Sequence, residues 1–303
     1  MTDLTISRSL YPFDAHYFDA AGARMHYLDE GDTAAEPIVM VHGNPTWSFY
    51  YRALVKALRP RYRCVVPDHV GMGMSDKPDD GKYPYTLARR VDDLERLLDH
   101  VRIDRDVTLV LHDWGGMIGM AWAARHPERV ARLVILNTAA FHLPGDKSFP
   151  WPLRLTRTPV GAALVRGLNA FSEVASRVCV TRAPMPDEIR RAYVAPYGSY
   201  ADRIATLRFV QDIPLSPSDA AYRVVSETQK KLHLFAHLPA LICWGDRDFV
   251  FDHAFLREWR RYLPEAKVVR FPDCGHYVLE DAAEEIVELV KDFLREHPLP
   301  ARA

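Results

Sequence analysis

One short segment, from Thr108 to Gly116, constrains the fold and the chemistry of this chain more than any other. It reads T-L-V-L-H-D-W-G-G, and its apolar run ends at His112 and Asp113. Two glycines follow, and apolar residues then recur at helical spacing as far as Ala124. This pattern predicts a strand, a sharp turn and a helix, with Asp113 at the apex of the turn. A carboxylate held there predicts nucleophilic attack on an electrophilic carbon.

Strand and helix patterns alternate on both sides of this segment. The expected strands are Tyr17–Asp19, Met25–Leu28, Pro37–Val41, Tyr62–Pro67, Leu109–Leu111, Leu133–Leu136, Leu238–Trp244 and Lys267–Phe271. The expected helices are Trp47–Leu58, a helix that Thr86 caps, the helix after Asp113, Ala254–Tyr262 and Ala282–Glu296. Continuous apolar strands that alternate with helices predict an α/β fold. We expect a mostly parallel, doubly wound sheet of eight strands with helices on both faces.

The alternation is interrupted over residues 142–237. This segment is rich in proline and contains helical pieces, notably Val160–Val180 and Asp187–Tyr193. We therefore predict a core made of residues 1–141 and 238–303, with residues 142–237 inserted as a helical lid. Val160–Val180 fits two interpretations, a surface that contacts a membrane or a partner, or the apolar core of the lid. The second interpretation is favoured.

The overall composition excludes several classes of function. The net charge is −1 and no run of like charges exists, so nucleic acid is excluded as a partner. The 4 cysteines are scattered without a C-x-x-C pair, which argues against a metal site and fits a reducing compartment. Gly71–Ser75 lacks the third glycine and the lysine of nucleotide-binding loops. There is no signal-peptide core and no apolar run that could span a bilayer. We expect a cytoplasmic protein with no cofactor, no metal and no membrane span.

Three ionisable residues follow predicted strands in the order Asp113, Asp248, His276. Because the carboxyl ends of parallel strands meet at one edge of a sheet, we expect these side chains to lie together. An aspartate is ionised near pH 7 and attacks without a base, forming an ester. His276 would then activate water against that ester, while Asp248, favoured over Asp246, would hold the imidazole.

Two further residues complete the predicted site. Asn44 and Trp114 each carry a side-chain N–H donor, and neither takes a proton from the nucleophile. Together they are predicted to bind an anion, either a leaving group or an ester oxyanion. The loss of one such donor typically costs ~3 kcal/mol of transition-state stabilisation. His112, beside the apex, is predicted to be structural.

Four motifs carry a resemblance to a known family: H-G-N-P-T at 42–46, H-D-W-G-G at 112–116, W-G-D-R-D at 244–248 and C-G-H at 274–276. Together they resemble the haloalkane dehalogenases over nearly the whole chain, which implies an α/β-hydrolase fold. In that family the triad acid is aspartate or glutamate on different strands. The third dehalogenase subfamily has a similar combination of residues. In this chain the combination consists of Asn44, Trp114 and an acid late in the sequence, Asp248, with Asn137 where some members keep a glutamate.

That subfamily also contains the β-lactone decarboxylases of bacterial long-chain olefin biosynthesis. The segment Arg208–Leu215 is similar to theirs. The resemblance implies an apolar small-molecule substrate and weak activity on haloalkanes. It also implies self-association, or assembly with other enzymes of olefin biosynthesis.

Four functions are compatible with these residues. The preferred one is cleavage of a cis-β-lactone to an alkene and carbon dioxide, and the second is hydrolytic dehalogenation of an alkyl halide. Epoxide hydrolases share the H-D-W-G-G turn but usually have an apolar residue where Asn44 stands. A catalytically inactive fold that serves as a ligand receptor or as an assembly subunit is disfavoured because Asp113, Asp248 and His276 are all present.

Overall fold

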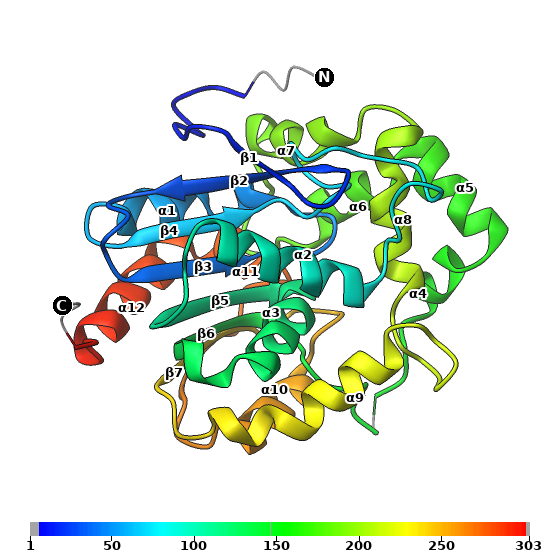
Figure 1. Cartoon of the computed structure of the whole chain (residues 1–303). Helices are drawn as coiled ribbons and strands as arrows, with labels where there is room; N and C mark the ends of the chain where they lie inside the picture. Colours follow the sequence, from blue (N-terminus) through cyan, green and yellow to red (C-terminus); the bar gives the residue numbers. More distant parts are fainter. Residues whose placement is uncertain (1–5, 146, 301–303) are drawn as a thin grey trace.

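The computed structural model of the chain describes residues 6–145 and 147–300 (Figure 1). A central sheet has the strand order β1-β2-β4-β3-β5-β6-β7-β8. The strands are β1 His16–Asp19, β2 Arg24–Glu30, β3 Pro37–Val41, β4 Arg63–Pro67, β5 Val107–Asp113, β6 Val130–Thr138, β7 Ala240–Gly245 and β8 Lys267–Phe271. Neighbours from β4 across to β8 are parallel, whereas β2 is antiparallel to both β1 and β4. The predicted α/β fold with a mostly parallel, eight-stranded sheet is confirmed.

The central strands β3 to β7 are buried along almost their whole length because both faces of the sheet are covered. Side chains alternate along each strand, so Val39 and Leu109 join one hydrophobic cluster while Ile38 and Val110 join another. The helices that contribute to the first cluster include α2 Leu87–His100, α3 Trp114–Arg125 and α10 His253–Tyr262. The helices that contribute to the second include α1 Arg52–Leu58, α11 Val278–Asp281 and α12 Ala283–Glu296.

The predicted core helices are confirmed, with changes at their ends. The helix expected from Trp47 begins as a 3₁₀ turn, η1 Ser48–Tyr51, before α1. The Thr86 hydroxyl caps α2 by accepting a hydrogen bond from the backbone of Arg89. Helix α11 was not predicted, because its four residues are too few to show a helical period.

The segment between β6 and β7 forms a helical insertion, which we define as residues 142–237. Its helices are α4 Trp151–Thr156, α5 Pro159–Leu168, α6 Ala170–Val178, α7 Asp187–Val194, α8 Ile204–Gln211 and α9 Tyr222–Lys231. The insertion also contains the 3₁₀ turns η3 Ala195–Tyr197, η4 Ala201–Arg203 and η5 Leu232–Phe235, while η2 Pro127–Arg129 belongs to the core. No strand occurs among the described residues of the insertion, as predicted. Figure 1 shows α4, α5, α6 and α8 gathered at one end of the sheet.

One expectation for Val160–Val180 was wrong, and another holds only in part. The segment is not one helix, because Asn169 adopts a left-handed conformation (φ 53°) that ends α5 before α6 begins. It is also only partly lid core. Val165 and Ala175 are buried, but five large apolar side chains are exposed: Val160, Leu164, Leu168, Val174 and Val178. Within the described ranges, no helix is both long enough and apolar enough to cross a membrane.

Candidate active site

The turn after β5 places Asp113 between a strand and a helix, as predicted. Asp113 has a positive φ of 51°, which a side-chain-bearing residue adopts only when its surroundings hold it. The two glycines that follow allow α3 to pack closely. A Cβ atom at Gly115 would lie 1.8 Å from the Val41 carbonyl oxygen, and one at Gly116 would lie 2.0 Å from the Thr138 hydroxyl. The glycine pair therefore lets this helix start directly behind the carboxylate.

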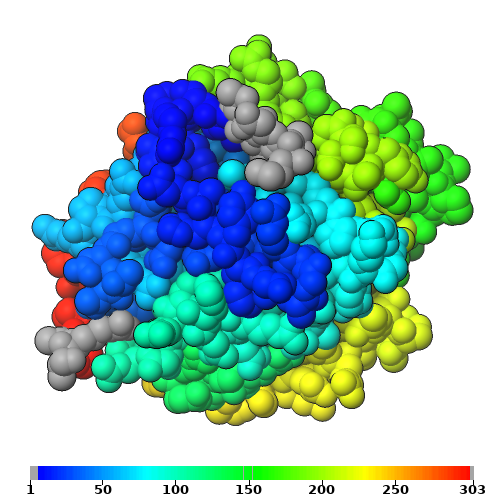
Figure 2. Space-filling view, turned by 45° about the horizontal axis from the view of Figure 1, so that its top comes forward, coloured from blue at the N-terminus to red at the C-terminus, as the bar shows by residue number. Residues whose placement is uncertain are grey.

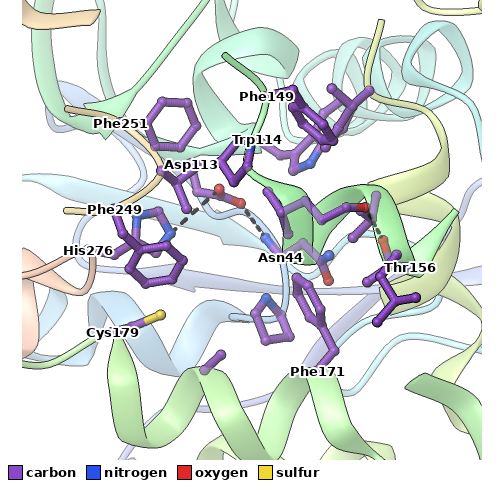
Figure 3. Close-up of a pocket in the computed structure, with 18 of the residues that line it drawn as sticks. Asn44, Asp113, Trp114, Phe149, Thr156, Phe171, Cys179, Phe249, Phe251 and His276 are labelled. Carbon is purple, nitrogen blue, oxygen red and sulfur yellow. Dashed lines mark hydrogen bonds and ion pairs between the residues drawn. The ribbon is translucent and has the colours of Figure 1, made fainter. Parts of the chain in front are cut away.

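The structure brings Asp113, His276 and Asp248 together. His276 Nδ1 lies 2.8 Å from Asp248 Oδ2. His276 Nε2 lies 3.6 Å from Asp113 Oδ2, an interaction drawn as a dashed line in Figure 3. All three residues are buried. The other oxygen of Asp248 accepts backbone N–H groups from Val250 and Phe251, so this carboxylate is fixed by the loop after β7. Asp246, the competing candidate, instead forms an ion pair with Arg270.

The electrostatics of the three groups are coupled. Burial raises the pKa of Asp113, and the opposing effects of His276 and of backbone N–H donors at Asn44 and Trp114 do not cancel it. Burial alone would lower the pKa of His276. The charge and the hydrogen bond of Asp248, together with the charge of Asp113, outweigh burial, and the pKa of His276 is raised. The imidazole therefore holds a proton more readily than a free histidine does.

Asn44 and Trp114 lie beside Asp113 on the wall of one cavity (Figure 3). The backbone N–H of Asn44 donates to Asp113 Oδ1 at 2.6 Å. Its side-chain Nδ2 donates a hydrogen bond to the Thr206 carbonyl at 3.0 Å, and this bond uses one of the two hydrogens of the amide group. The second hydrogen is left for another acceptor. The two predicted donors are thus close to the nucleophile, as expected.

Asn137 is a residue whose contribution was missed. The sequence indicated only that it could not serve as the acid. In the structure its Nδ2 donates to Asp248 Oδ2 and to the Gly245 carbonyl, both at 3.0 Å. Its Oδ1 accepts the Gly245 N–H at 2.8 Å. Asn137 therefore ties the end of β6 to the carboxylate that orients His276.

His112 has the structural role that was predicted. Its ring is fully buried against Tyr50, and its Nε2 lies 2.9 Å from the backbone carbonyl of His276. The neutral imidazole therefore donates to that carbonyl and holds the loop of His276 against β5.

Helix α8 of the insertion contacts both predicted anion donors. Thr206 accepts the hydrogen bond of Asn44, and the Phe209 ring packs edge-on against Trp114 with 5.4 Å between ring centroids. These contacts were missed, because α8 shows only an ordinary helical pattern in the sequence. The insertion thus helps to orient side chains that belong to the core.

A buried ion pair anchors α8 to the core. The Arg90 guanidinium of α2 lies 3.7 Å from the centroid of the Phe209 ring and 3.4 Å from Asp212 Oδ2. The same oxygen accepts the backbone N–H of Leu87 at 2.5 Å. Burial raises the pKa of Asp212 to about 6, in spite of the Arg90 charge. This pair fixes α8 against the first turn of α2.

The cavity that contains these residues is almost entirely apolar. Its volume is about 390 Å³, and Asp113, His276, Asn44 and Trp114 all line it. Phenylalanines contribute much of the remaining wall: Phe141, Phe149, Phe171, Phe249, Phe251 and Phe255. No cluster of His, Cys, Asp and Glu that could hold a metal ion occurs in the described part of the chain. The arrangement can offer a carboxylate nucleophile to an apolar substrate.

Comparisons with known proteins show which families this chain is similar to. A family profile described as the alpha/beta hydrolase fold matches residues 36–283. A cis-3-alkyl-4-alkyloxetan-2-one decarboxylase of Shewanella oneidensis is 57% identical over 289 residues, which cover 95% of this chain and 90% of the relative. A protein of the same name from Xanthomonas campestris is 52% identical, with 92% of this chain and 94% of the relative covered.

Haloalkane dehalogenases are more distant. Haloalkane dehalogenase 2 of Mycobacterium bovis is 32% identical, with 95% of this chain and 97% of the relative covered. The crystal structure of a haloalkane dehalogenase from Bradyrhizobium elkani superposes with a TM-score of 0.85 at 27% identity, covering 94% of this chain and 98% of that one. The similarity to all of these proteins therefore extends over the core and the insertion.

Proposed function

Because this chain belongs to the α/β-hydrolase fold family, we propose that it is an enzyme that uses Asp113 to decarboxylate a cis-β-lactone carrying two alkyl substituents. The observation that carries the proposal is the position of Asp113, which lies beside His276 in a cavity walled by phenylalanines. Such a cavity accommodates alkyl chains and excludes water from the reacting carbon. The relatives named as decarboxylases are much more similar to this chain than those named as dehalogenases.

The proposed reaction begins with attack of Asp113 on the ring carbon that bears the lactone oxygen. That carbon–oxygen bond breaks, so an ester forms on Asp113 and a carboxylate is released on the neighbouring carbon. The carboxylate then leaves as carbon dioxide. The electrons of its carbon–carbon bond form the double bond, and Asp113 departs as a carboxylate. One lactone gives one alkene and one carbon dioxide, with no water consumed.

The neighbouring residues have distinct roles in this scheme. The N–H groups of Asn44 and Trp114 stabilise the carboxylate released in the first step. His276, whose pKa is raised, stabilises the Asp113 carboxylate as it is regenerated in the second step. Asp248 orients His276. Inversion at the attacked carbon followed by anti elimination leaves the two alkyl groups cis on the alkene.

The second candidate function is hydrolytic dehalogenation. The observation that favours it is the 3.6 Å separation between His276 Nε2 and Asp113 Oδ2, which puts a base next to any ester on Asp113. After halide loss, neutral His276 would activate a water molecule against the ester carbonyl. This route differs from decarboxylation because water then supplies an oxygen to Asp113.

Single turnover in water enriched in heavy oxygen tests the proposal. The enzyme is mixed separately with a long-chain cis-β-lactone, a bromoalkane and an epoxide, and alkene, halide and diol are measured. The mass of the peptide that contains Asp113 is then measured by mass spectrometry, with Asp113→Asn as the inactive control. We expect cis-alkene from the lactone and no label in Asp113. Labelled Asp113 after lactone turnover, or faster release of bromide than of alkene, would refute the proposed function.

We also propose the setting in which the enzyme works. Residues 142–237 act as a lid on the core formed by residues 1–141 and 238–303. The protein is placed in the cytoplasm, where its four buried, unpaired cysteines fit a reducing environment. It self-associates or assembles with the other enzymes of olefin biosynthesis, since a strained lactone is better transferred directly than released into water.

A further inference from the structure

Large apolar side chains are exposed mainly on three neighbouring helices of the insertion. Of the twelve such residues exposed in the described chain, seven belong to α4, α5 and α6: Trp151, Leu155, Val160, Leu164, Leu168, Val174 and Val178. They recur four residues apart on each helix, so each helix presents an apolar stripe to solvent. Figure 2 shows the green part of the insertion projecting beyond the core. We call these seven residues the apolar face.

The apolar face is continuous with the mouth of the cavity. Leu155, Leu164, Val174 and Val178 line the cavity and are also exposed. An exposed residue that lines a cavity marks the place where the cavity opens. A molecule leaving the cavity therefore meets an apolar surface rather than a polar rim.

The three helices are positively charged, although the whole chain carries a net charge of −1. They contain three arginines and one glutamate. Arg177 pairs with Glu173 of the same helix. Arg157, just beyond α4, pairs with Asp219, while Arg154 and Arg166 form no ion pair with any described residue. Arg154 and Arg166 therefore add positive charge beside the exposed apolar side chains, and the charge of Arg166 also helps to lower the pKa of Asp80.

Two aromatic residues with polar atoms lie on this side of the insertion. Trp151 is 75% exposed at the start of α4, and Tyr200 is 58% exposed. The Arg166 guanidinium lies 4.0 Å from the centroid of the Tyr200 ring. Trp and Tyr favour the boundary between water and hydrocarbon, because one part of the ring system is apolar and another forms hydrogen bonds.

We propose that the apolar face docks on the anionic surface of a lipid bilayer and opens the cavity toward the acyl chains. Apolar side chains, basic residues and interfacial aromatics together are the features of a surface that lies on such a membrane. The benefit of docking rests on the proposed function, since a long-chain alkene dissolves in acyl chains and not in water. A second copy fits this face less well, because a two-fold contact would bring two positively charged faces together and close the cavity.

Sedimentation with lipid vesicles tests this proposal without any catalytic turnover. The wild-type protein is mixed with vesicles of phosphatidylcholine alone and of phosphatidylcholine with phosphatidylglycerol. We expect co-sedimentation with the anionic vesicles only. A triple variant, Trp151→Gln, Val160→Gln and Leu168→Gln, should bind about tenfold or more weakly, because three exposed apolar side chains are lost. None of these three residues lines the cavity, so basal activity should be unchanged.

Matched controls separate the proposal from a general loss of apolar surface. Leu168→Gln alone should weaken vesicle binding, whereas Leu234→Gln, at an exposed leucine of η5, should not. Arg154→Gln should weaken binding to anionic vesicles, and added salt should mimic it.

Several outcomes would overturn the proposal. These are no sedimentation of the wild type with either vesicle, equal sedimentation with both, or equal effects of Leu168→Gln and Leu234→Gln. A wild type that is dimeric in solution beside a monomeric triple variant would assign the face to a second copy. Vesicle binding by a protein that releases no alkene would instead refute the proposed function and leave the membrane surface supported.

Discussion

Replacing Asn137 by aspartate tests how the orientation of Asp248 is maintained. The substitution preserves the shape of the side chain but places a second carboxylate oxygen 3.0 Å from Asp248 Oδ2. At an effective dielectric constant of about 20, two unit charges at this distance repel by about 5 to 6 kcal/mol. Because ~1.4 kcal/mol corresponds to a tenfold change in proton affinity, the pair should retain one proton at neutral pH. That proton replaces the hydrogen bond from the amide of Asn137.

The expected result is a new dependence on pH. At neutral pH, Asn137→Asp should keep substantial activity, because Asp248 still accepts a hydrogen bond and still faces His276. As pH rises, the shared proton leaves, and two carboxylates near His276 hold it in its protonated form. The pair binds a proton more tightly in the folded than in the unfolded chain. The free energy of unfolding should therefore fall as pH rises from about 4, the ordinary pKa of an aspartate, to the raised pKa of the pair, by up to about 5 kcal/mol in total.

Thermal unfolding from about pH 4 to alkaline pH, and bromoalkane hydrolysis from neutral to alkaline pH, test this result. Asn169→Asp is the matched control, since Asn169 is also buried and also has a positive φ but lies in the insertion. The wild type and the control should show no comparable loss. An Asn137→Asp variant whose stability and activity follow the wild type across this range would refute the argument that Asn137 acts through Asp248.

Three other changes have defined outcomes. Gly43→Ala would place a Cβ 2.0 Å from Asp113 Oδ1, so circular dichroism should show a folded protein whose kcat is about 100-fold lower, since the nucleophile is displaced. Trp114→Phe keeps the ring packing and removes one N–H, and should lower kcat for the lactone about 100-fold with little change in KM. In pH–rate profiles, lactone turnover should decline as pH is lowered, and the decline should begin above the ordinary pKa of an aspartate because burial raises the pKa of Asp113. On the same acid side, bromoalkane hydrolysis should decline at a higher pH than lactone turnover, because it needs neutral His276, whose pKa is raised.

Each of these has a contradicting result. An unimpaired Gly43→Ala enzyme would mean that Asp113 is free to move. An equal change in KM and kcat for Trp114→Phe would indicate a packing role rather than anion binding. Identical acid limbs for both substrates would contradict a water-activating role for His276 that is limited to hydrolysis.

The positions of Asp113, Asp248 and His276 could be predicted because each lies at or shortly after the end of a predicted strand. Parallel strands end at one edge, so order along the chain implied proximity in space. The same reasoning could not find the contacts of Asn137 with Asp248 and Gly245. They depend on a positive φ of 32° at Asn137, which is set by tertiary packing and leaves no periodic signal.

The insertion was less predictable than the core for a related reason. Amphipathic periodicity identifies an apolar stripe but does not say whether another element covers it. Leu164 and Val165 are equally apolar, yet one is exposed and the other buried. The break at Asn169 was also missed, since asparagine is tolerated inside a helix and equally adopts the left-handed conformation that ends one.

The contacts of α8 have a consequence for how such enzymes can diversify. The nucleophile, acid and histidine belong to loops of the sheet, whereas the insertion supplies much of the cavity wall, so substrate range could change by exchanging residues 142–237 between relatives. Thr206 and Phe209 limit that modularity, because they hold Asn44 and Trp114 from the exchanged side. A chimaera that keeps a carbonyl and an aromatic ring at these two positions should gain a new substrate preference and retain its catalytic rate. A chimaera that loses them should bind the new substrates but turn them over slowly.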